Sequence, residues 1–481
     1  MFINGEWRGA GPTFPSINPA TTKPIAQVPL ATPAHVAQAV EAARAALPAW
    51  RALGTPNRAN MLTGALERLR EAYGDEGAPT PLKNLITQEV GKRLPEADIE
   101  VTESADMLEY FIGSAQSLLG REVLALDKAL WPTKSSTVMY EPVGVVAVIK
   151  PWNYPLELPM WSIAPALIAG NTVVFKPAED ASLVGAELTR LIADFVPDGV
   201  LNLVSGPADV GRMLVEADID MVSFTGSTAV GHEITAWCGA HMRRYTMELG
   251  GNDAAIVMPD ADIELSANGL TWGCFCNSGQ VCVRPKRIFV HQTVAQDLVS
   301  AVVEKTHALR RGVDFGPLIN AMQLTTVEEQ IEDARISGAR VLCGGTRFTD
   351  GGYYYAPTIL VDVTPSMRVM REECFGPVMP IVTFESTEEA LGLANSGVYG
   401  LGASIWTADV AGGSQLAEAL DCGMVWVNDV NVAFPQAPWG GRKSSGTGTE
   451  LGKWGLHEYV TPKHINIDTD KATRRAWWYP Y

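Results

Sequence analysis

The sequence has few of the features that mark secreted, membrane-spanning or metal-binding proteins. It has only seven cysteines in 481 residues, an odd number spread too thinly for a disulfide framework, which indicates reduced thiols. These cysteines and the seven histidines do not combine at zinc-ligand spacing, so we predict no metal site. No apolar run is long enough to cross a bilayer, and residues 1–7 lack a signal peptide's basic and apolar regions. These absences predict a cytoplasmic protein with no membrane contact.

Positive charge is also scarce. The chain carries 37 Lys and Arg against 54 Asp and Glu, a formal net charge of −17, and its few basic pairs are scattered. Because phosphate neutralisation needs clustered cations, we expect no nucleic-acid partner. With 47% apolar and 19% charged residues, the composition is that of a globular protein of two or three domains.

The first part of the chain predicts a strand-turn-strand flap followed by packing helices. Prolines divide the short strand-like runs of residues 4–29, and apolar residues then recur at helical spacing over 34–52, 58–72 and 83–117. Thr32 and Thr55, each followed by proline, are the expected helix caps.

The middle of the chain alternates strands and helices, as in a parallel sheet covered on both faces. A first series begins with the apolar run 145–149, and a second begins after Gly250-Gly251. The fold class is therefore α/β, with a Rossmann-type first domain. We assign the domains to residues 1–121 and 141–249, to residues 250–456, and to an arm and tail made of residues 122–140 and 457–481.

The arm and tail are polar, strand-like pieces far apart in sequence. Such exposed strands favour pairing with another subunit. A homo-oligomer is therefore expected.

A single stretch, Asn277-Ser278-Gly279-Gln280-Val281-Cys282, combines turn residues with a nucleophile. The turn residues end a helix-compatible segment and leave Cys282 rigid yet reachable. Taken alone, a free cysteine is more often a small buried hydrophobe, so the functional interpretation depends on partners elsewhere.

Two stretches are candidates for dinucleotide contacts. Gly226-Ser227 follows a strand and opens a helix, where free N–H groups favour phosphate; an ordinary capped helix is an equal alternative. Lys176 and Glu179 end another strand, where they could meet a ribose or form a solvated turn. The G-x-G sequences at 400–402 and 446–448 lack the right context and are interpreted as turns.

Two further residues are candidate partners of the cysteine. Glu248 precedes Gly250-Gly251 and could act as a base if burial raised its pKa, or be a solvated acid at a hinge. Asn153, after the first strand of the regular region, offers an amide suited to an oxyanion, or it satisfies backbone groups.

These motifs together resemble the NAD(P)-dependent aldehyde dehydrogenase superfamily over nearly the whole chain. The resemblance rests on ordered, separated stretches: residues 3–7, 18–21, 151–155, 176–179, 224–227, 248–251, 277–282, 373–378 and 438–441. It implies an aldehyde dehydrogenase-like fold with a Rossmann-type cofactor domain, an α/β catalytic domain and a small β oligomerisation arm, assembled as a homodimer or homotetramer.

The resemblance also implies roles. Cys282 would attack the aldehyde, Asn153 and the Cys282 N–H would hold the oxyanion, and Glu248 would activate the hydrolytic water. The implied cofactor contacts are Trp152, Lys176, Glu179, Gly226, Ser227, Glu373 and Phe375. The cofactor is expected to be NAD, since Glu179 would repel a 2′-phosphate, with NADP as the alternative. Two alternatives are a CoA-acylating enzyme and a catalytically silent relative. The presence of Glu248 favours hydrolysis over transfer to CoA, and the intact set of Cys282, Glu248 and Asn153 argues against a silent relative.

Substrate choice is expected to follow the pocket walls, which the resemblance places at Tyr154, Trp161, Cys276, Val281, Val283, Phe434 and Trp439. These walls favour an apolar, aromatic or amino-aldehyde substrate. Residues 271–275 and 436–441 look most like the betaine/amino-aldehyde branch, in which aromatic rings can cage a cation. Cys276 stands where that branch has a bulky aromatic, and the sequence offers no account of Asn252-Asp253 or Arg442.

Overall fold

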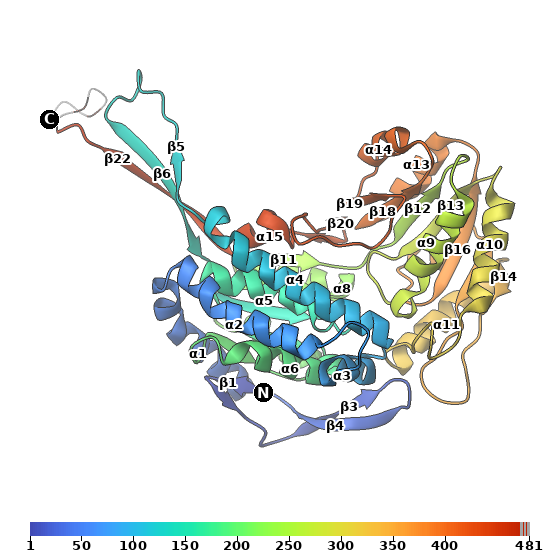
Figure 1. Cartoon of the computed structure of the whole chain (residues 1–481), viewed down its shortest axis with the longest axis horizontal. Helices are drawn as coiled ribbons and strands as arrows, with labels where there is room; N and C mark the ends of the chain where they lie inside the picture. Colours follow the sequence, from blue (N-terminus) through green and yellow to red (C-terminus); the bar gives the residue numbers. More distant parts are fainter. Residues whose placement is uncertain (472–474, 476–477, 479–481) are drawn as a thin grey trace.

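The computed structural model describes residues 1–471, 475 and 478, arranged around two large sheets with a narrow arm projecting from the body (Figure 1). The predicted aromatic end of the tail lies mostly outside the described residues, which omit 472–474, 476–477 and 479–481. In the described part of the chain, no helix is long and apolar enough to cross a membrane.

The first sheet has eight strands in the order β2-β1-β9-β8-β7-β10-β11-β21. Its five central strands are parallel and its outer strands antiparallel. The central strands are β7 (Val145–Lys150), β8 (Thr172–Pro177), β9 (Leu201–Leu203), β10 (Met221–Thr225) and β11 (Arg244–Glu248); the outer strands are β1 (Phe2–Ile3), β2 (Glu6–Trp7) and β21 (Gly446–Thr447). Numbered along the chain, the parallel strands follow the order 3-2-1-4-5 of a dinucleotide-binding sheet.

Helices cover both faces of this sheet. Alternate residues of β7 point to opposite faces, and both sets are buried. Val146 and Val148 belong to one buried cluster, and Val145, Ala147 and Ile149 to another. The first cluster includes α2 (Thr55–Tyr73), α3 (Pro81–Val90), α4 (Leu94–Leu118), α5 (Glu157–Ala169) and α6 (Ser182–Ala193); the second includes α1 (Pro33–Ala52), α7 (Ala208–Glu216) and α8 (Thr228–Ala240). The short helices η1 (Glu179–Ala181) and α15 (Gly452–Glu458) complete this half.

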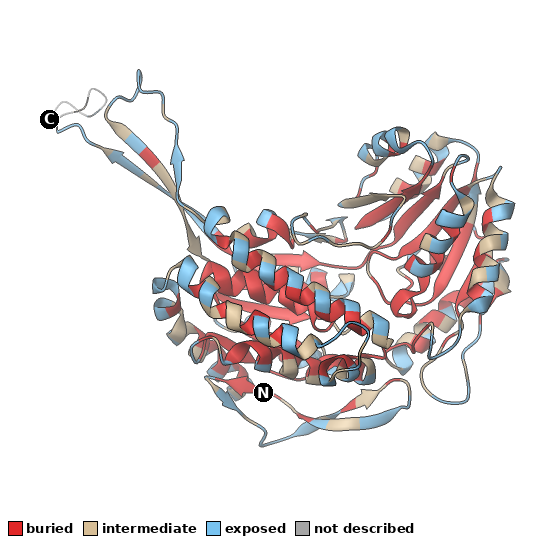
Figure 2. Cartoon of the chain, viewed as in Figure 1, coloured by how far each residue is buried: buried red, intermediate tan, exposed pale blue. Residues whose placement is uncertain are grey.

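The second sheet has seven strands in the order β14-β15-β16-β13-β12-β18-β19, of which only β14 runs antiparallel. Its strands are β12 (Asp253–Val257), β13 (Pro285–His291), β14 (Arg340–Cys343), β15 (Thr358–Val361), β16 (Val378–Phe384), β18 (Gly402–Trp406) and β19 (Met424–Val427). Around it lie α9 (Ile263–Phe275), η2 (Cys276–Gly279), α10 (Ala295–Ala308), α11 (Ala321–Ile336), α12 (Arg368–Arg371), α13 (Thr387–Asn395) and α14 (Val410–Glu418). Figure 2 shows the central strands of both sheets buried along nearly their whole length.

The smaller sheets lie outside these two layers. The arm consists of β22 (Val460–Asp468), β6 (Lys134–Pro142) and β5 (Glu122–Leu124), paired antiparallel from Val460↔Pro142 to Asp468↔Lys134. A hairpin joins β3 (Thr13–Asn18) to β4 (Lys23–Pro29), and β17 (Tyr399–Gly400) pairs with β20 (Arg442–Lys443).

Several local expectations are wrong for identifiable reasons. The helix expected over 83–117 is two helices, because Gly91 ends α3 in the left-handed conformation (φ 79°) and Pro95 opens α4. Thr32 caps α1 as expected, accepting from the His35 N–H, but the cap of α2 is Gly54, and Thr55 lies inside the helix. The supposed turn glycines include Gly402, which begins β18, and Gly446, which pairs with Glu248.

Candidate active site

The loop that leads to Cys282 is held in an unusual backbone conformation. After α9, residues Asn277, Ser278 and Gly279 have φ values of 46°, 55° and 75°, so the predicted turn is confirmed. A side chain on Gly279 would lie 2.1 Å from the carbonyl oxygen of Gly376, which explains the glycine. Ser278 Oγ donates to the Gly316 carbonyl at 2.7 Å, and these contacts fix where the chain leaves the turn.

Cys282 lies at the corner of a second turn, closed by a 3.3 Å hydrogen bond from the Arg284 N–H to the Val281 carbonyl. It is the one cysteine of the seven that is not buried. Burial of its thiol nevertheless raises the pKa to about 12, with Lys286 opposing the shift and Glu248 adding to it. The resting sulfur is therefore a neutral thiol that needs a base before it can attack.

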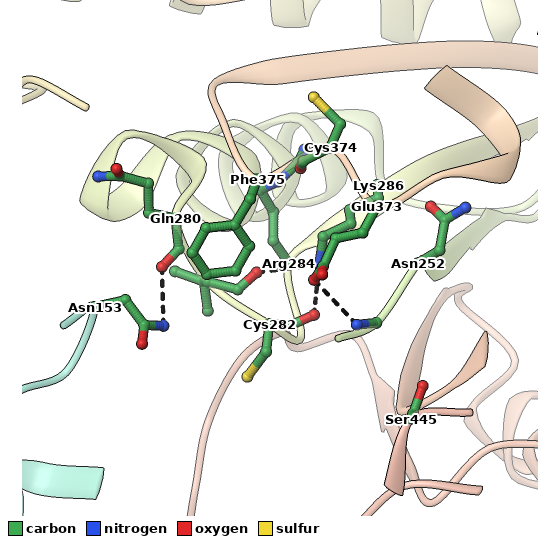
Figure 3. A network of polar contacts seen from close by, with 12 residues as sticks. Asn153, Asn252, Gln280, Cys282, Arg284, Lys286, Glu373, Cys374, Phe375 and Ser445 are labelled. Atoms are coloured by element: carbon green, nitrogen blue, oxygen red, sulfur yellow. Dashed lines mark hydrogen bonds and ion pairs between the residues drawn. The ribbon is translucent and has the colours of Figure 1, made fainter. Parts of the chain in front are cut away.

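Asn153, which follows β7, is buried against the nucleophile loop. The side-chain Nδ2 of Asn153 donates to the Gln280 backbone carbonyl at 3.1 Å (Figure 3). The backbone carbonyl of Asn153 accepts from Asn277 Nδ2 at 3.0 Å. Since an amide nitrogen carries two hydrogens, one N–H is left for a ligand beside Cys282. Figure 3 shows the Cys282 sulfur turned away from the side on which Lys286 and Glu373 lie.

Glu248 ends β11 as a buried carboxylate, and in the described part of the chain its Oε1 has no hydrogen-bond partner. Burial raises its pKa well above the ordinary value and the nearby Glu450 adds to this, while Lys150 opposes it. Gly440 leaves room at this oxygen, because a side chain there would begin 3.5 Å away. A carboxylate in this state accepts a proton more readily than an ordinary glutamate, as a general base must.

Lys150 and Glu450 were not singled out from the sequence. The Lys150 ammonium contacts the Glu450 carboxylate and donates to Thr225 Oγ1 at 2.7 Å, and Ser162 Oγ donates to Glu450 at 3.0 Å. The lone charge that ends the apolar run 145–149 was a usable signal for Lys150. Glu450 offered none, because the fold alone brings it to the strand ends.

The candidate dinucleotide contacts gather at the carboxyl ends of the same strands. Lys176 is buried at the end of β8, where it donates to the Pro177 carbonyl at 2.9 Å. Burial lowers its pKa to about 8, while the negative charges of Glu179 and Asp180 act to raise it. Glu179 is exposed. Ser227 caps α8 by accepting from the Val230 N–H. The start of α8 and the buried cation at the end of β8 are both features that suit a phosphate-bearing cofactor.

The three remaining cofactor candidates are Trp152, Glu373 and Phe375. Trp152 and Phe375 pack edge to face with ring centres 5.6 Å apart. Glu373 accepts from the Gly251 N–H at 3.0 Å, and Lys286 Nζ lies 3.4 Å from the same oxygen, Oε1.

Most of the predicted pocket residues belong to one buried apolar cluster: Trp161, Cys276, Val281, Val283 and Trp439, with Tyr154 packed against it. Trp161 and Trp439 pack edge to face at 5.1 Å. Phe434 is outside the cluster and 54% exposed, so the structure does not bring it together with the others.

A buried charged cluster adjoins Tyr154. The Lys92 ammonium lies 3.3 Å from the centre of the Tyr154 ring and 2.6 Å from Glu100. Burial raises the pKa of Glu103 and of Glu157, which share a hydrogen bond. Sequence reasoning missed this group because its members come from the loop before α4, from α4 and from α5, which only the fold brings together.

Comparison with known proteins gives a consistent result. The family model described as "Aldehyde dehydrogenase family" matches residues 7–465. The chloroplastic betaine aldehyde dehydrogenase of Amaranthus hypochondriacus is 36% identical, covering 100% of this chain and 98% of that protein. The peroxisomal aminoaldehyde dehydrogenase 1 of Pisum sativum is 36% identical, covering 100% and 97%.

Solved structures agree with these relatives. Betaine aldehyde dehydrogenase from Staphylococcus aureus, in complex with NAD+, is 32% identical with a TM-score of 0.94, covering 100% of this chain and 96% of that one. Lactaldehyde dehydrogenase from Escherichia coli is 35% identical with a TM-score of 0.92, covering 97% and 98%. These likenesses confirm the predicted fold class and the suspected branch.

The expected cytoplasmic location is wrong in the light of these relatives. The names of the plant proteins place them in chloroplasts or peroxisomes. The beginning of the sequence was therefore not a sufficient basis for a location.

Proposed function

Because the chain belongs to the aldehyde dehydrogenase family, and is thus an enzyme that oxidises aldehydes, we propose that it uses NAD and a thioester on Cys282 to form the carboxylic acid. The observation that carries this proposal concerns the surroundings of the partly exposed Cys282. The Asn153 amide binds the loop that holds it, and the charge of Glu248, whose Oε1 has no hydrogen-bond partner among the described residues, acts on its thiol.

In the first step, the Cys282 sulfur loses its proton to a base, for which Glu248 is the candidate, and bonds to the aldehyde carbon. The carbonyl oxygen becomes an oxyanion, which the free Asn153 N–H and the Cys282 backbone N–H hold. Bound NAD supplies the acceptor for the hydride that leaves this carbon.

The second step is hydrolysis of the resulting thioester. Glu248 first releases the thiol proton to solvent and then removes a proton from water. The hydroxide adds to the thioester carbon, the carbon–sulfur bond breaks to release the acid, and the sulfur takes the proton back from Glu248 to restore the thiol. The buried pair of Lys150 and Glu450 next to Glu248 adjusts how readily Glu248 takes up this proton, because Glu450 raises its pKa and Lys150 lowers it.

The cofactor site is proposed from the strand order and the residues at the strand ends. Lys176 and Glu179 would meet the adenine ribose, Gly226 and Ser227 the pyrophosphate, and Trp152, Glu373 and Phe375 the nicotinamide end. NAD is supported by the exposed carboxylate of Glu179 and by the NAD+ named for the Staphylococcus aureus relative; NADP is the alternative.

For the substrate we propose an amino-aldehyde first, and an apolar or aromatic aldehyde second. The names of the plant relatives support the first class. The paired rings of Trp161 and Trp439 support the second class.

We also propose the domain division given above, with an oligomer built through the arm. Each large sheet has its own buried clusters on its two faces. The arm exposes Val123, Leu124 and Ile467, an apolar surface suited to a second copy in a homodimer or homotetramer. Light scattering of the purified protein tests the assembly, and a monomer at micromolar concentration contradicts it.

The test of the reaction is a panel of aldehydes assayed for NADH formation with NAD and with NADP. We expect turnover with the native protein and none with Cys282→Ala. For Glu248→Gln we expect a burst of NADH followed by loss of steady-state turnover, since hydride transfer precedes hydrolysis. Full turnover by Cys282→Ala, or a product captured only by added coenzyme A, contradicts the proposal.

A further inference from the structure

A buried lysine directly beneath the nucleophile has been given no role so far. Lys286, the second residue of β13, is fully buried. Its Nζ donates to the Cys282 carbonyl at 2.5 Å and to the Val281 carbonyl at 3.1 Å, and it lies 3.4 Å from Glu373 Oε1 (Figure 3). Two of the three donors of the ammonium are thus used on backbone carbonyls of the nucleophile turn, and Glu373 is its ion-pair partner.

Two carboxylates accompany this buried cation. Glu373 is in direct contact, and Asp253, on the neighbouring β12, is buried and interacts electrostatically with Lys286. A buried ammonium is costly unless it is paired and hydrogen-bonded. The two carboxylates and two carbonyls offset that cost.

The position of the ammonium determines which way the Cys282 N–H points. The Val281 C=O and the Cys282 N–H belong to one trans peptide and point in opposite directions. Since the Val281 oxygen accepts from both Lys286 Nζ and the Arg284 N–H, the Cys282 N–H must face away from them. Among the described residues, no group accepts a hydrogen bond from it.

We propose that Lys286 is the positioning residue of the nucleophile turn. By holding the carbonyls of Val281 and Cys282, it fixes the Cys282 N–H toward the oxyanion, and its charge favours the thiolate over the thiol. This inference rests on the proposed function, because an oxyanion forms only if Cys282 attacks a carbonyl group.

The decisive variant is Lys286→Met, which keeps the length of the side chain and removes the charge and the donors. We expect kcat to fall about 10²-fold, the loss typical of one oxyanion donor, with KM changed little. Carbamidomethylation of Cys282 by iodoacetamide, followed by mass spectrometry from pH 7 to 9, should slow about tenfold at every pH, since loss of a nearby cation disfavours the thiolate. The other charged groups that face this sulfur, Glu248, Asp253 and Glu373, are unchanged.

The chain contains a matched control. Lys83 is also fully buried and donates to two backbone carbonyls, of Asp75 and Ala78, beside one carboxylate, Asp98. Lys83→Met should lower the melting temperature without changing the alkylation rate or kcat. If Lys286→Met does not fold, Lys286→Met/Asp253→Asn removes a cation and an anion together. It should show the same low kcat, with a smaller slowing of alkylation than the single variant, because Asp253 disfavours the thiolate.

Wild-type alkylation and kcat in a folded Lys286 variant would overturn the inference, as would equal losses in Lys83→Met. The alkylation assay needs neither aldehyde nor cofactor. A native protein that oxidises no aldehyde would therefore count against the proposed function, whereas an unchanged alkylation rate would count against Lys286 alone.

Discussion

Lys150 and Glu450, 300 positions apart in the chain, form a buried ion pair whose two charges act in opposite directions on Glu248. Lys150 ends β7, and Glu450 lies just before α15. Glu248 ends β11, so strands from one sheet and a late segment of the chain meet at the proposed base.

This pair predicts opposite effects on the acid side of the pH profile. Glu248 acts only when deprotonated, so kcat is lost as pH falls through its raised pKa. Lys150→Met removes a charge that lowers this pKa and should move the acid limb to higher pH; Glu450→Gln removes a charge that raises it and should move the limb to lower pH. Profiles of kcat against pH measure both shifts.

The control for the pair is the double variant Lys150→Met/Glu450→Gln, whose acid limb should lie between those of the single variants. Each single variant leaves one buried charge unpaired and should be less stable than the double. Shifts in the same direction would contradict the assignment of Glu248 as the titrating base.

Asn153 should be required for turnover but not for folding. Asn153→Ala removes the proposed oxyanion donor, and we expect kcat to fall 10²- to 10³-fold by order of magnitude. Asn202→Ala is the control: Asn202 is equally buried, donating to Gly199 and accepting from the Asn4 N–H. It should cost about 1–3 kcal/mol of stability and leave kcat unchanged. Equal kcat for the two variants would remove Asn153 from the mechanism.

Glu179 should decide between the two cofactors. Glu179→Ser removes the carboxylate that would repel a 2′-phosphate, while Lys176 stays to attract it. We expect the ratio of kcat/KM for NADP to that for NAD to rise about tenfold or more, corresponding to one removed like-charge contact. Glu187→Ser, at a partly exposed acid on the following helix α6, is the control, and a ratio unchanged in both variants refutes the role of Glu179.

Asp253 should make stability depend on pH. Burial raises its pKa to about 7, with Lys286 opposing the shift, so the folded state binds this proton more tightly than the unfolded chain. Below the pKa that Asp253 has in the unfolded chain, both states are protonated and Asp253 gives stability no pH dependence. As pH rises from that pKa through about 7, the free energy of unfolding falls, because only the folded state still holds the proton. Thermal midpoints from pH 5 to 8 should therefore decline less steeply in Asp253→Asn, and parallel declines would show that Asp253 does not carry this effect.

The local residue pattern was sufficient to predict most of the regular strands and helices. The apolar run 145–149 predicts a buried parallel strand because it lacks polar alternation, and β7 is buried throughout. The turn before Cys282 was predicted from Asn277-Ser278-Gly279, whereas the positive φ values of all three residues are a finding of the structure. Boundaries failed where a short break divided one periodic pattern, as Gly91 does between α3 and α4.

The sequence by itself determined the α/β class, the family and the candidate roles of Cys282, Glu248 and Asn153, because these depend on short motifs and local periodicity. Only the tertiary structure decided which charges surround them. Lys286 beneath the nucleophile, the Lys150–Glu450 pair beside Glu248 and the Lys92 cluster behind Tyr154 depend on burial and on contacts between distant segments. The residues next to a single lysine or glutamate in the sequence do not reveal whether its side chain will lie in solvent or in the core.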